Sequence, residues 1–194
     1  MSVTIDPHNC VILPEAVFII GTYDENGVPN AMNAAWGTQT DFNEITISLS
    51  KHKTTENLEK TGEFTVAFGT VDTVTICDYF GVESGKSINK IVKAGCHEHK
   101  SDNVNAPIIE EFPLTLECKV KSWNPDEGIL VGEIVGQQAD ESIMAADGHV
   151  DLDKMKPIIY DASIHAYRGI GPVIARAFEE GLKIKKSEKQ WDSQ

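Results

Sequence analysis

The sequence predicts an α+β fold whose core is an antiparallel β-barrel. About six short apolar stretches are separated mostly by turn signals, which is typical of neighbouring antiparallel strands. Some of these stretches alternate strictly between apolar and polar residues, as half-buried strands do. A long alternation of strands with helices, which would favour a doubly wound parallel sheet, is missing from the sequence. The length of 194 residues suits one large domain.

The first two predicted strands form a hairpin. Residues 16–22 are apolar, and the turn signal at residues 24–27 leads into a second strand through residues 31–38. Residues 45–50 form the next strand, with isoleucine and leucine on one face and hydroxyl side chains on the other.

Helices are predicted where the period of the pattern changes. Residues 54–61 contain good helix formers, begin with a threonine hydroxyl suited to an N-cap and end at Gly62. Residues 63–68 return to a strand. Two further helices are predicted over residues 71–80 and 87–94, and a glycine ends the second one.

A second hairpin is predicted in the C-terminal half. Residues 114–121 alternate between apolar and polar side chains, so we expect one buried face and one solvent face. The segment 123–128 turns the chain back into a strand over residues 129–135.

The end of the chain is predicted to be a short helix followed by a tail. The helix covers residues 173–180 and is stopped by Gly181. We expect one domain over residues 1–182. The polar tail, residues 183–194, is expected to fray or to lie on a neighbouring molecule.

Composition argues against several classes of function. Seventeen basic and 30 acidic residues give a net charge of −13, which repels nucleic acid and anionic membranes. The longest apolar run, residues 16–20, is far shorter than the ~20 residues of a membrane span. No secretory signal pattern is present, and Cys10, Cys77, Cys96 and Cys118 form no CxxC pair. We therefore expect a cytoplasmic protein with reduced thiols.

Three familiar motifs are absent or incomplete. The sequence Cys96-His97-Glu98-His99 offers metal ligands, but no second ligand pair matches it, so we predict no metal site. Residues 165–171 lack the glycine spacing of a dinucleotide fingerprint. There is no G-x-S-x-G elbow for a nucleophilic serine either.

The sharpest local feature is Ser50-Lys51-His52-Lys53-Thr54-Thr55, which lies between a predicted strand and a predicted helix. Hydroxyls and lysines beside the free N–H groups of a helix N-terminus form an anion site suited to phosphate. The alternative is a solvated N-cap with exposed lysines. The segment 85–90 adds two lysines at another helix start, where an exposed helix face is the usual interpretation.

The segment 30–37 favours a flat ligand. Its alanines and glycine let a ligand approach the backbone, Asn33 can bond to the edge of a heterocycle, and Trp36 can form a wall. A strand packed tightly against a helix is the alternative, because small residues are equally suited to it.

Taken in order, these segments resemble the flavin reductase-like family of FMN-binding split barrels, and most closely its flavoredoxin-type members. The resemblance covers roughly residues 10–180. It rests on the order and spacing of an apolar strand after a proline, a glycine turn, the small-residue segment, the lysine–threonine helix start and a late aromatic–glycine motif. These are residues 14–22, 27, 29–36, 45–50, 53–58, 62–66 and 167–171.

The resemblance implies a homodimer of split barrels with one FMN per subunit, bound near the dimer interface. It places Asn33, Ala34, Ala35 and Trp36 along the isoalloxazine ring. It assigns the ribityl phosphate to Ser50, His52, Lys53, Thr54 and Thr55, with Asn57 on the first turn of the helix.

Two further positions follow from the same resemblance. Lys90 matches a family lysine that usually follows an aspartate, but Asn89 precedes it here, which leaves the role of Lys90 open. Tyr167 is expected to approach the flavin or to close the barrel.

The family implies that the flavin carries the redox chemistry, so no acid or base of the protein is required. The first interpretation is an oxidoreductase in which NAD(P)H reduces bound FMN and electrons are passed on. The second is an electron carrier that exchanges electrons with a redox protein. The third is a barrel that binds another phosphorylated small molecule or serves as a scaffold.

Overall fold

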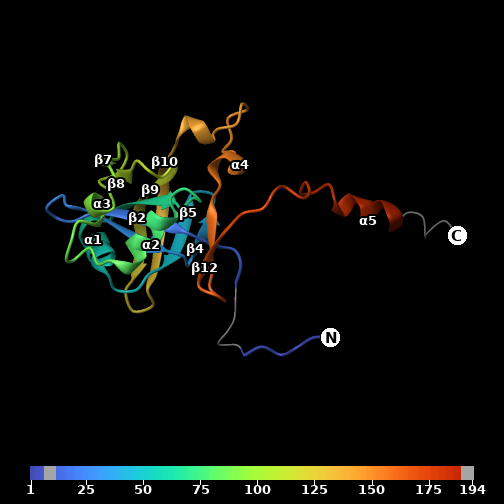
Figure 1. Cartoon of the computed structure of the whole chain (residues 1–194), viewed down its shortest axis with the longest axis horizontal. Coiled ribbons are helices and arrows are strands. Elements are labelled where there is room, and N and C mark those ends of the chain that lie inside the picture. Colours follow the sequence, from blue (N-terminus) through green and yellow to red (C-terminus); the bar gives the residue numbers. More distant parts are fainter. Residues whose placement is uncertain (7–11, 189–194) are drawn as a thin grey trace.

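A curled antiparallel sheet of seven strands forms the centre of the molecule, as the computed structural model shows for residues 1–6 and 12–188 (Figure 1). This half-barrel confirms the predicted α+β split-barrel class. Cys10 lies outside the described residues. In sheet order the strands are β3 (Pro29–Ala34), β2 (Phe18–Tyr23), β6 (Glu63–Phe68), β9 (Leu114–Asn124), β10 (Ile129–Ala139), β5 (Glu44–Ser48) and β4 (Gly37–Asp41).

Smaller elements surround this sheet. One three-stranded sheet consists of β1 (Glu15–Ala16), β11 (Ile158–Asp161) and β12 (Ala166–Gly169), and one two-stranded sheet of β7 (Glu98–Lys100) and β8 (Pro107–Ile109). The helical elements are α1 (Lys53–Thr61), α2 (Val74–Val82), α3 (Lys90–Lys93), the 3₁₀ turn η2 (Glu141–Ile143), α4 (Leu152–Met155) and α5 (Gly181–Glu188).

The apolar face of β5 lies in the main core, as its alternation predicted. Ile45, Ile47 and Leu49 are buried there against β6, β10 and α1. Strand β10 crosses Phe64 so closely that a Cβ at Gly132 would overlap the ring, which explains the glycine at that position. The hairpin of β2 and β3 is also confirmed, with Phe18 opposite Ala34.

The prediction that one face of β9 is exposed to solvent is wrong for the N-terminal half of the strand. Thr115 and Glu117 are buried, because the loop that connects β7 and β8 lies over this face. The Glu117 carboxylate accepts hydrogen bonds from Ser101 Oγ at 2.5 Å, Asn103 Nδ2 at 2.8 Å and Gln138 Nε2 at 3.1 Å. Burial raises the pKa of Glu117, but these donors outweigh burial and hold the pKa below its ordinary value.

The predicted strand over residues 31–38 is two strands. The first strand, β3, pairs with β2 and ends at Ala34, and the second, β4, pairs with β5 and begins at Gly37. Ala35 and Trp36 therefore cross from one end of the sheet to the other. Backbone pairing resumes at once, with Ser48 N donating to Trp36 O at 2.7 Å.

The helix α1 begins one residue earlier than predicted and is capped by His52 instead of a threonine hydroxyl. Thr55 occupies the third helical position and accepts a hydrogen bond from His52 N at 2.9 Å, which fixes the first turn. Gly62 ends the helix in the left-handed conformation, as predicted. The helices predicted over 71–80 and 87–94 are present as α2 and, much shortened, α3.

The helix predicted over residues 173–180 is wrong. Residues 177–180 form a turn, and Gly181 begins α5 instead of stopping a helix. The apolar pattern of this segment meets no surface of its own chain, since Ile174 and Phe178 are 96% exposed. Amphipathic helices owe most of their stability to packing, so the pattern alone did not determine the helix here. Among the residues described, no helix is long and apolar enough to cross a membrane.

Candidate functional site

Two adjoining cavities lie where β3, the N-terminus of α1 and the C-terminus of α2 meet. The first, here called the lysine cavity, has a volume of about 260 Å³ and contains Lys53 and Lys90 in its lining. The second, the tryptophan cavity, has a volume of about 460 Å³ and extends past Trp36. The two share Met32, Asn33, His52, Gly81 and Val82, so together they form one elongated site.

Lys90 is the most informative side chain of the lysine cavity. It is 4% exposed, and its ammonium donates to Phe80 O at 2.8 Å and lies 6.0 Å from the centre of the Phe80 ring. Burial lowers the pKa of Lys90 to about 8, and the charge of Glu83 offsets only part of this effect. An ammonium group has three donors, so this buried cation retains donors for an anionic ligand.

Asn89 explains how Lys90 is placed without the aspartate that the family resemblance leads one to expect. Its side chain accepts from Val92 N at 3.2 Å and caps α3, which starts at Lys90. An amide in this position adds no negative charge beside Lys90. The carboxylate whose charge acts on this ammonium is Glu83, which lines the same cavity.

The start of α1 forms the opposite wall of the lysine cavity. His52, Lys53 and Thr54, three of the residues that the resemblance assigns to the phosphate, line it. The ammonium of Lys53 lies 3.4 Å from Asp24 Oδ2, which neutralises part of its charge. Lys86 lies outside this cavity and is paired with Glu56 at 2.5 Å, so the exposed-face interpretation fits that lysine.

Small residues and aromatic rings line the tryptophan cavity. Ala34, Ala35 and Ser50 lie in its wall, and Trp36 stands at its edge with 63% of its surface exposed. Asn33 Nδ2 donates to Cys77 O at 2.8 Å and to the Tyr167 hydroxyl at 3.3 Å. Because its amide nitrogen is used internally, Asn33 can offer only its oxygen to a ligand.

Tyr167 lies in the same wall and belongs to a polar network. Its hydroxyl donates to Asp78 Oδ1 at 3.0 Å. Burial and then the neighbouring Asp78 raise the pKa of Tyr167 to about 12, so the phenol stays protonated at neutral pH. Tyr160 and His165 lie beside it, with the Tyr160 hydroxyl 2.7 Å from His165 Nδ1.

Two predicted site residues are not brought to either cavity. Thr55 and Asn57 are 2% and 1% exposed and serve the fold. Thr55 bonds to the cap residue of α1, and Asn57 Nδ2 donates to Thr22 Oγ1 at 3.0 Å. Ser50 lines the tryptophan cavity, whereas the resemblance assigned it to the phosphate.

Sequence analysis missed Asp78, Gly81, Val82, Tyr160 and His165, which also line the site. Asp78 was assigned to a predicted helix with no chemical role, Gly81 and Val82 lay beyond its predicted end at residue 80, and His165 was considered only as part of a dinucleotide motif. No local signal marks these residues, because they reach the site through tertiary packing. In the described ranges, no group of three or more histidine, cysteine or acidic side chains is placed to hold a metal.

The chain belongs to the flavin reductase like domain family, whose model matches residues 10–162, more than half of the chain. Fold and site agree with this class: an antiparallel half-barrel with an elongated cavity that is cationic at one end and lined by small and aromatic residues at the other.

Within that class, the chain is similar to two solved flavoredoxins. It is 30% identical to the flavoredoxin of Desulfovibrio vulgaris (Miyazaki F), with a TM-score of 0.86 over 93% of this chain and 98% of that one. It is 26% identical to the flavoredoxin of Methanosarcina acetivorans, with a TM-score of 0.85 over 95% and 99% of the two chains.

Curated relatives match over shorter regions. A protein of Archaeoglobus fulgidus is 31% identical over 112 residues, which are 55% of this chain and 63% of that protein. A protein of Aquifex aeolicus is 28% identical over 107 residues, or 54% and 55% of the two chains. The chain therefore covers less than two thirds of either relative.

Proposed function

We propose that the elongated site binds FMN and that the protein is an oxidoreductase in which NAD(P)H reduces the bound flavin and electrons pass on to an acceptor. The observation that carries this proposal is the buried ammonium of Lys90, with spare donors, in the lining of a cavity that adjoins a wider chamber. A phosphate at one end and a flat ring system at the other match this shape and charge.

In this arrangement Lys90, Lys53 and the start of α1 hold the phosphate. Charge-assisted hydrogen bonds from ammonium groups to phosphate are the strongest contacts the site offers. Ala34 and Ala35 leave room for the ring, and Asn33 accepts a hydrogen bond from a ring N–H. When bound, the flavin supplies the redox chemistry, since it accepts a hydride and passes electrons on.

The other residues orient the ring and exclude water from part of it. Tyr167 stays protonated beside Asp78, so it presents a neutral, fixed aromatic edge. The chamber is open at Trp36, so a nicotinamide or a redox protein can reach the ring from solvent. The similarity to flavoredoxins supports electron exchange with a protein as a second candidate function.

Two measurements test this proposal. The purified protein, incubated with FMN and then desalted, is expected to be yellow and to show the absorption bands of bound flavin. A protein that stays colourless with excess FMN contradicts FMN binding and favours another phosphorylated ligand. Stopped-flow mixing with NADH and NADPH then separates the two flavin functions: rapid bleaching supports the reductase, and inertness to both supports the carrier.

We also propose that the protein works as a homodimer with no nucleic-acid or membrane partner, as the family resemblance and the net charge of −13 lead us to expect. The oligomeric state measured by sedimentation tests the first part. A monomer at cellular concentrations would contradict it.

A further inference from the structure

The C-terminal residues 170–184, here called the arm, include several apolar side chains that are largely exposed to solvent. The arm runs away from the sheets and ends in α5, on the side opposite α1 and α3 (Figure 1). Val173 is 82% exposed, and Ile174 and Phe178 are each 96% exposed. Ile170 and Leu182, at the two ends of the arm, are about half exposed, at 54% and 43%.

An arm of this kind needs a surface to pack on. Helix α5 has 8 residues, and isolated helices shorter than ~12–15 residues are only marginally stable in water. The stretch 171–180 can span at most ~33 Å at roughly 3.3 Å per residue, about the diameter of a small domain. The arm can therefore reach far beyond the body from which it starts.

A matching surface lies at the root of the arm. An apolar groove with a volume of about 330 Å³ runs between β1, β4, α4 and β11. Ile170, the first arm residue, lines this groove. Its other apolar lining residues include Pro14, Phe18, Phe68, Leu114, Leu152, Met155 and Ile159.

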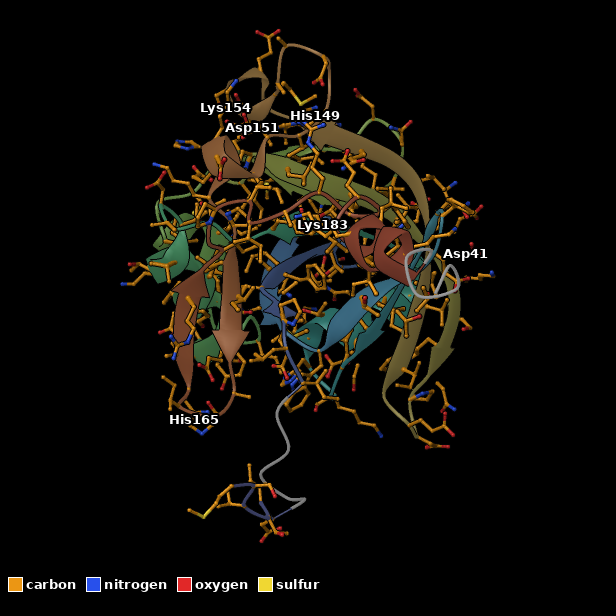
Figure 2. All side chains as sticks on the ribbon, turned by 90° about the vertical axis from the view of Figure 1, so that its right-hand side faces the viewer. Asp41, His149, Asp151, Lys154, His165 and Lys183 are labelled. Carbon is orange, nitrogen blue, oxygen red and sulfur yellow. The ribbon has the colours of Figure 1, made fainter. Side chains whose placement is uncertain are left out.

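Charged residues surround the face from which the arm projects. Figure 2 looks onto this face and shows Asp151, Lys154 and His149 above, Asp41 to the right and His165 below, with α5 and Lys183 in front. An apolar centre with a polar rim is the usual anatomy of a protein–protein interface.

The charge of helix α5 favours a second copy of this chain as the partner. Its sequence contains three lysines and one glutamate, and one of the lysines, Lys183, also pairs with Glu180 of its own chain, whereas the whole chain has a net charge of −13. A helix with a net positive charge is attracted to the acidic surface of a second copy, and the rim, which is mixed in charge, includes the carboxylates of Asp41 and Asp151 beside Lys154. Each copy has both an arm and a groove, so two identical contacts form together around a twofold axis.

We propose that the arm of one copy packs into the apolar groove of a second copy, with Ile174 and Phe178 as anchors and helix α5 near Asp41 and Asp151 of the rim. The inference rests on the proposed homodimer and names the segment that holds it together. This mutual packing of the two arms buries the exposed apolar side chains of both copies.

Sedimentation velocity of the full chain over a range of concentrations tests this exchange. Ile174→Asp combined with Phe178→Asp is expected to raise the dimer dissociation constant by ~100-fold or more, since buried aromatic anchors dominate interface energies. Val92→Asp is the matched control, because Val92 is 71% exposed on α3, at the opposite side of the molecule (Figure 1). It should dimerise like the wild type.

Hydrogen exchange locates the contact. In the dimer, the amides of residues 171–180 and of the groove strand β11 should exchange more slowly than in dilute, dissociated protein. An arm variant that dimerises as tightly as the wild type, an arm unprotected in the dimer or a monomeric wild type would each overturn the inference. The flavin spectrum is recorded in parallel: a colourless protein whose arm still drives dimerisation contradicts only the proposed flavin function.

Discussion

Replacing Lys90 by methionine should change ligand affinity and stability in opposite directions. Methionine has a similar length and no charge, so Lys90→Met removes the buried ammonium with little change in packing. Lys93→Met is a matched control, because Lys93 lies on the same helix, is exposed and carries the same charge. Both variants have the same net charge, so only the location of the lost cation differs.

The loss of FMN affinity follows from the bonds that Lys90 can make to a phosphate. A hydrogen bond to a charged group contributes about 1.5–3 kcal/mol, which corresponds to a roughly 10- to 150-fold increase in the dissociation constant. Titration of flavin fluorescence against each variant measures this change. Lys93→Met should bind FMN within about twofold of the wild type, because exposed charges contribute little.

The gain in stability follows from the cost of burying the ammonium in the ligand-free protein. The shift of the Lys90 pKa from 10.5 to about 8 corresponds to roughly 3 kcal/mol against the charged form. Loss of the hydrogen bond to Phe80 O offsets about 1–2 kcal/mol of this. Ligand-free Lys90→Met should therefore be about 1–2 kcal/mol more stable, which raises Tm by roughly 2–8 °C.

The pH dependence gives a second, independent readout. Below pH 8 the ammonium is charged in both the folded and the unfolded state, so the full destabilisation is present. Between pH 8 and 10.5 the unfolded chain binds more protons at this site, so wild-type stability rises with pH relative to Lys90→Met. A variant that is less stable than the wild type at pH 7 and binds FMN equally well would refute the assigned role of Lys90.

Three further predictions use the same assays. Lys53→Ala should weaken FMN binding by less than Lys90→Met, by about 1 kcal/mol, because Asp24 already neutralises part of the Lys53 charge; a larger loss than for Lys90→Met would contradict this order. Trp36→Ala should increase the fluorescence of bound flavin, and an unchanged emission spectrum would remove Trp36 from the ring wall. Glu117→Ala should lower the free energy of unfolding by about 3 kcal/mol at pH 7, since it leaves the buried Ser101 hydroxyl and the amide donors of Asn103 and Gln138 without this acceptor. Because the folded pKa of Glu117 is lowered, this difference should shrink in urea titrations as the pH falls below 4.5; a pH-independent difference would contradict the assignment.

Local sequence patterns were sufficient to predict those elements whose structure depends on neighbouring residues alone. The alternation of residues 45–50 predicted β5 and its buried face, and Gly62 predicted the end of α1. The segment predicted as an anion site is contiguous in sequence, and His52, Lys53 and Thr54 from it line one cavity; their contact with a phosphate stays a prediction. The flavin reductase-like resemblance was confirmed by the family model.

Long-range packing decided what the sequence could not show. Glu117 was expected on a solvent face, but the loop between β7 and β8 covers it. Asp78 and Tyr160 reach the site from α2 and β11, two elements far apart in the sequence, and no local pattern links them. The arm sequence has a helical pattern, but without a packing surface in its own chain the pattern was not realised.

The position of the site follows from the way the barrel is split. Strands β3 and β4 are consecutive in the chain but lie at opposite ends of the seven-stranded sheet, so the residues between them must cross the opening. Only Ala35 and Trp36 make this crossing, and a fully paired strand there would leave no chamber. The same two residues line the tryptophan cavity. A small residue followed by an exposed aromatic at the crossing therefore serves both the topology and the ligand: the first keeps the chamber open, and the second forms its outer edge.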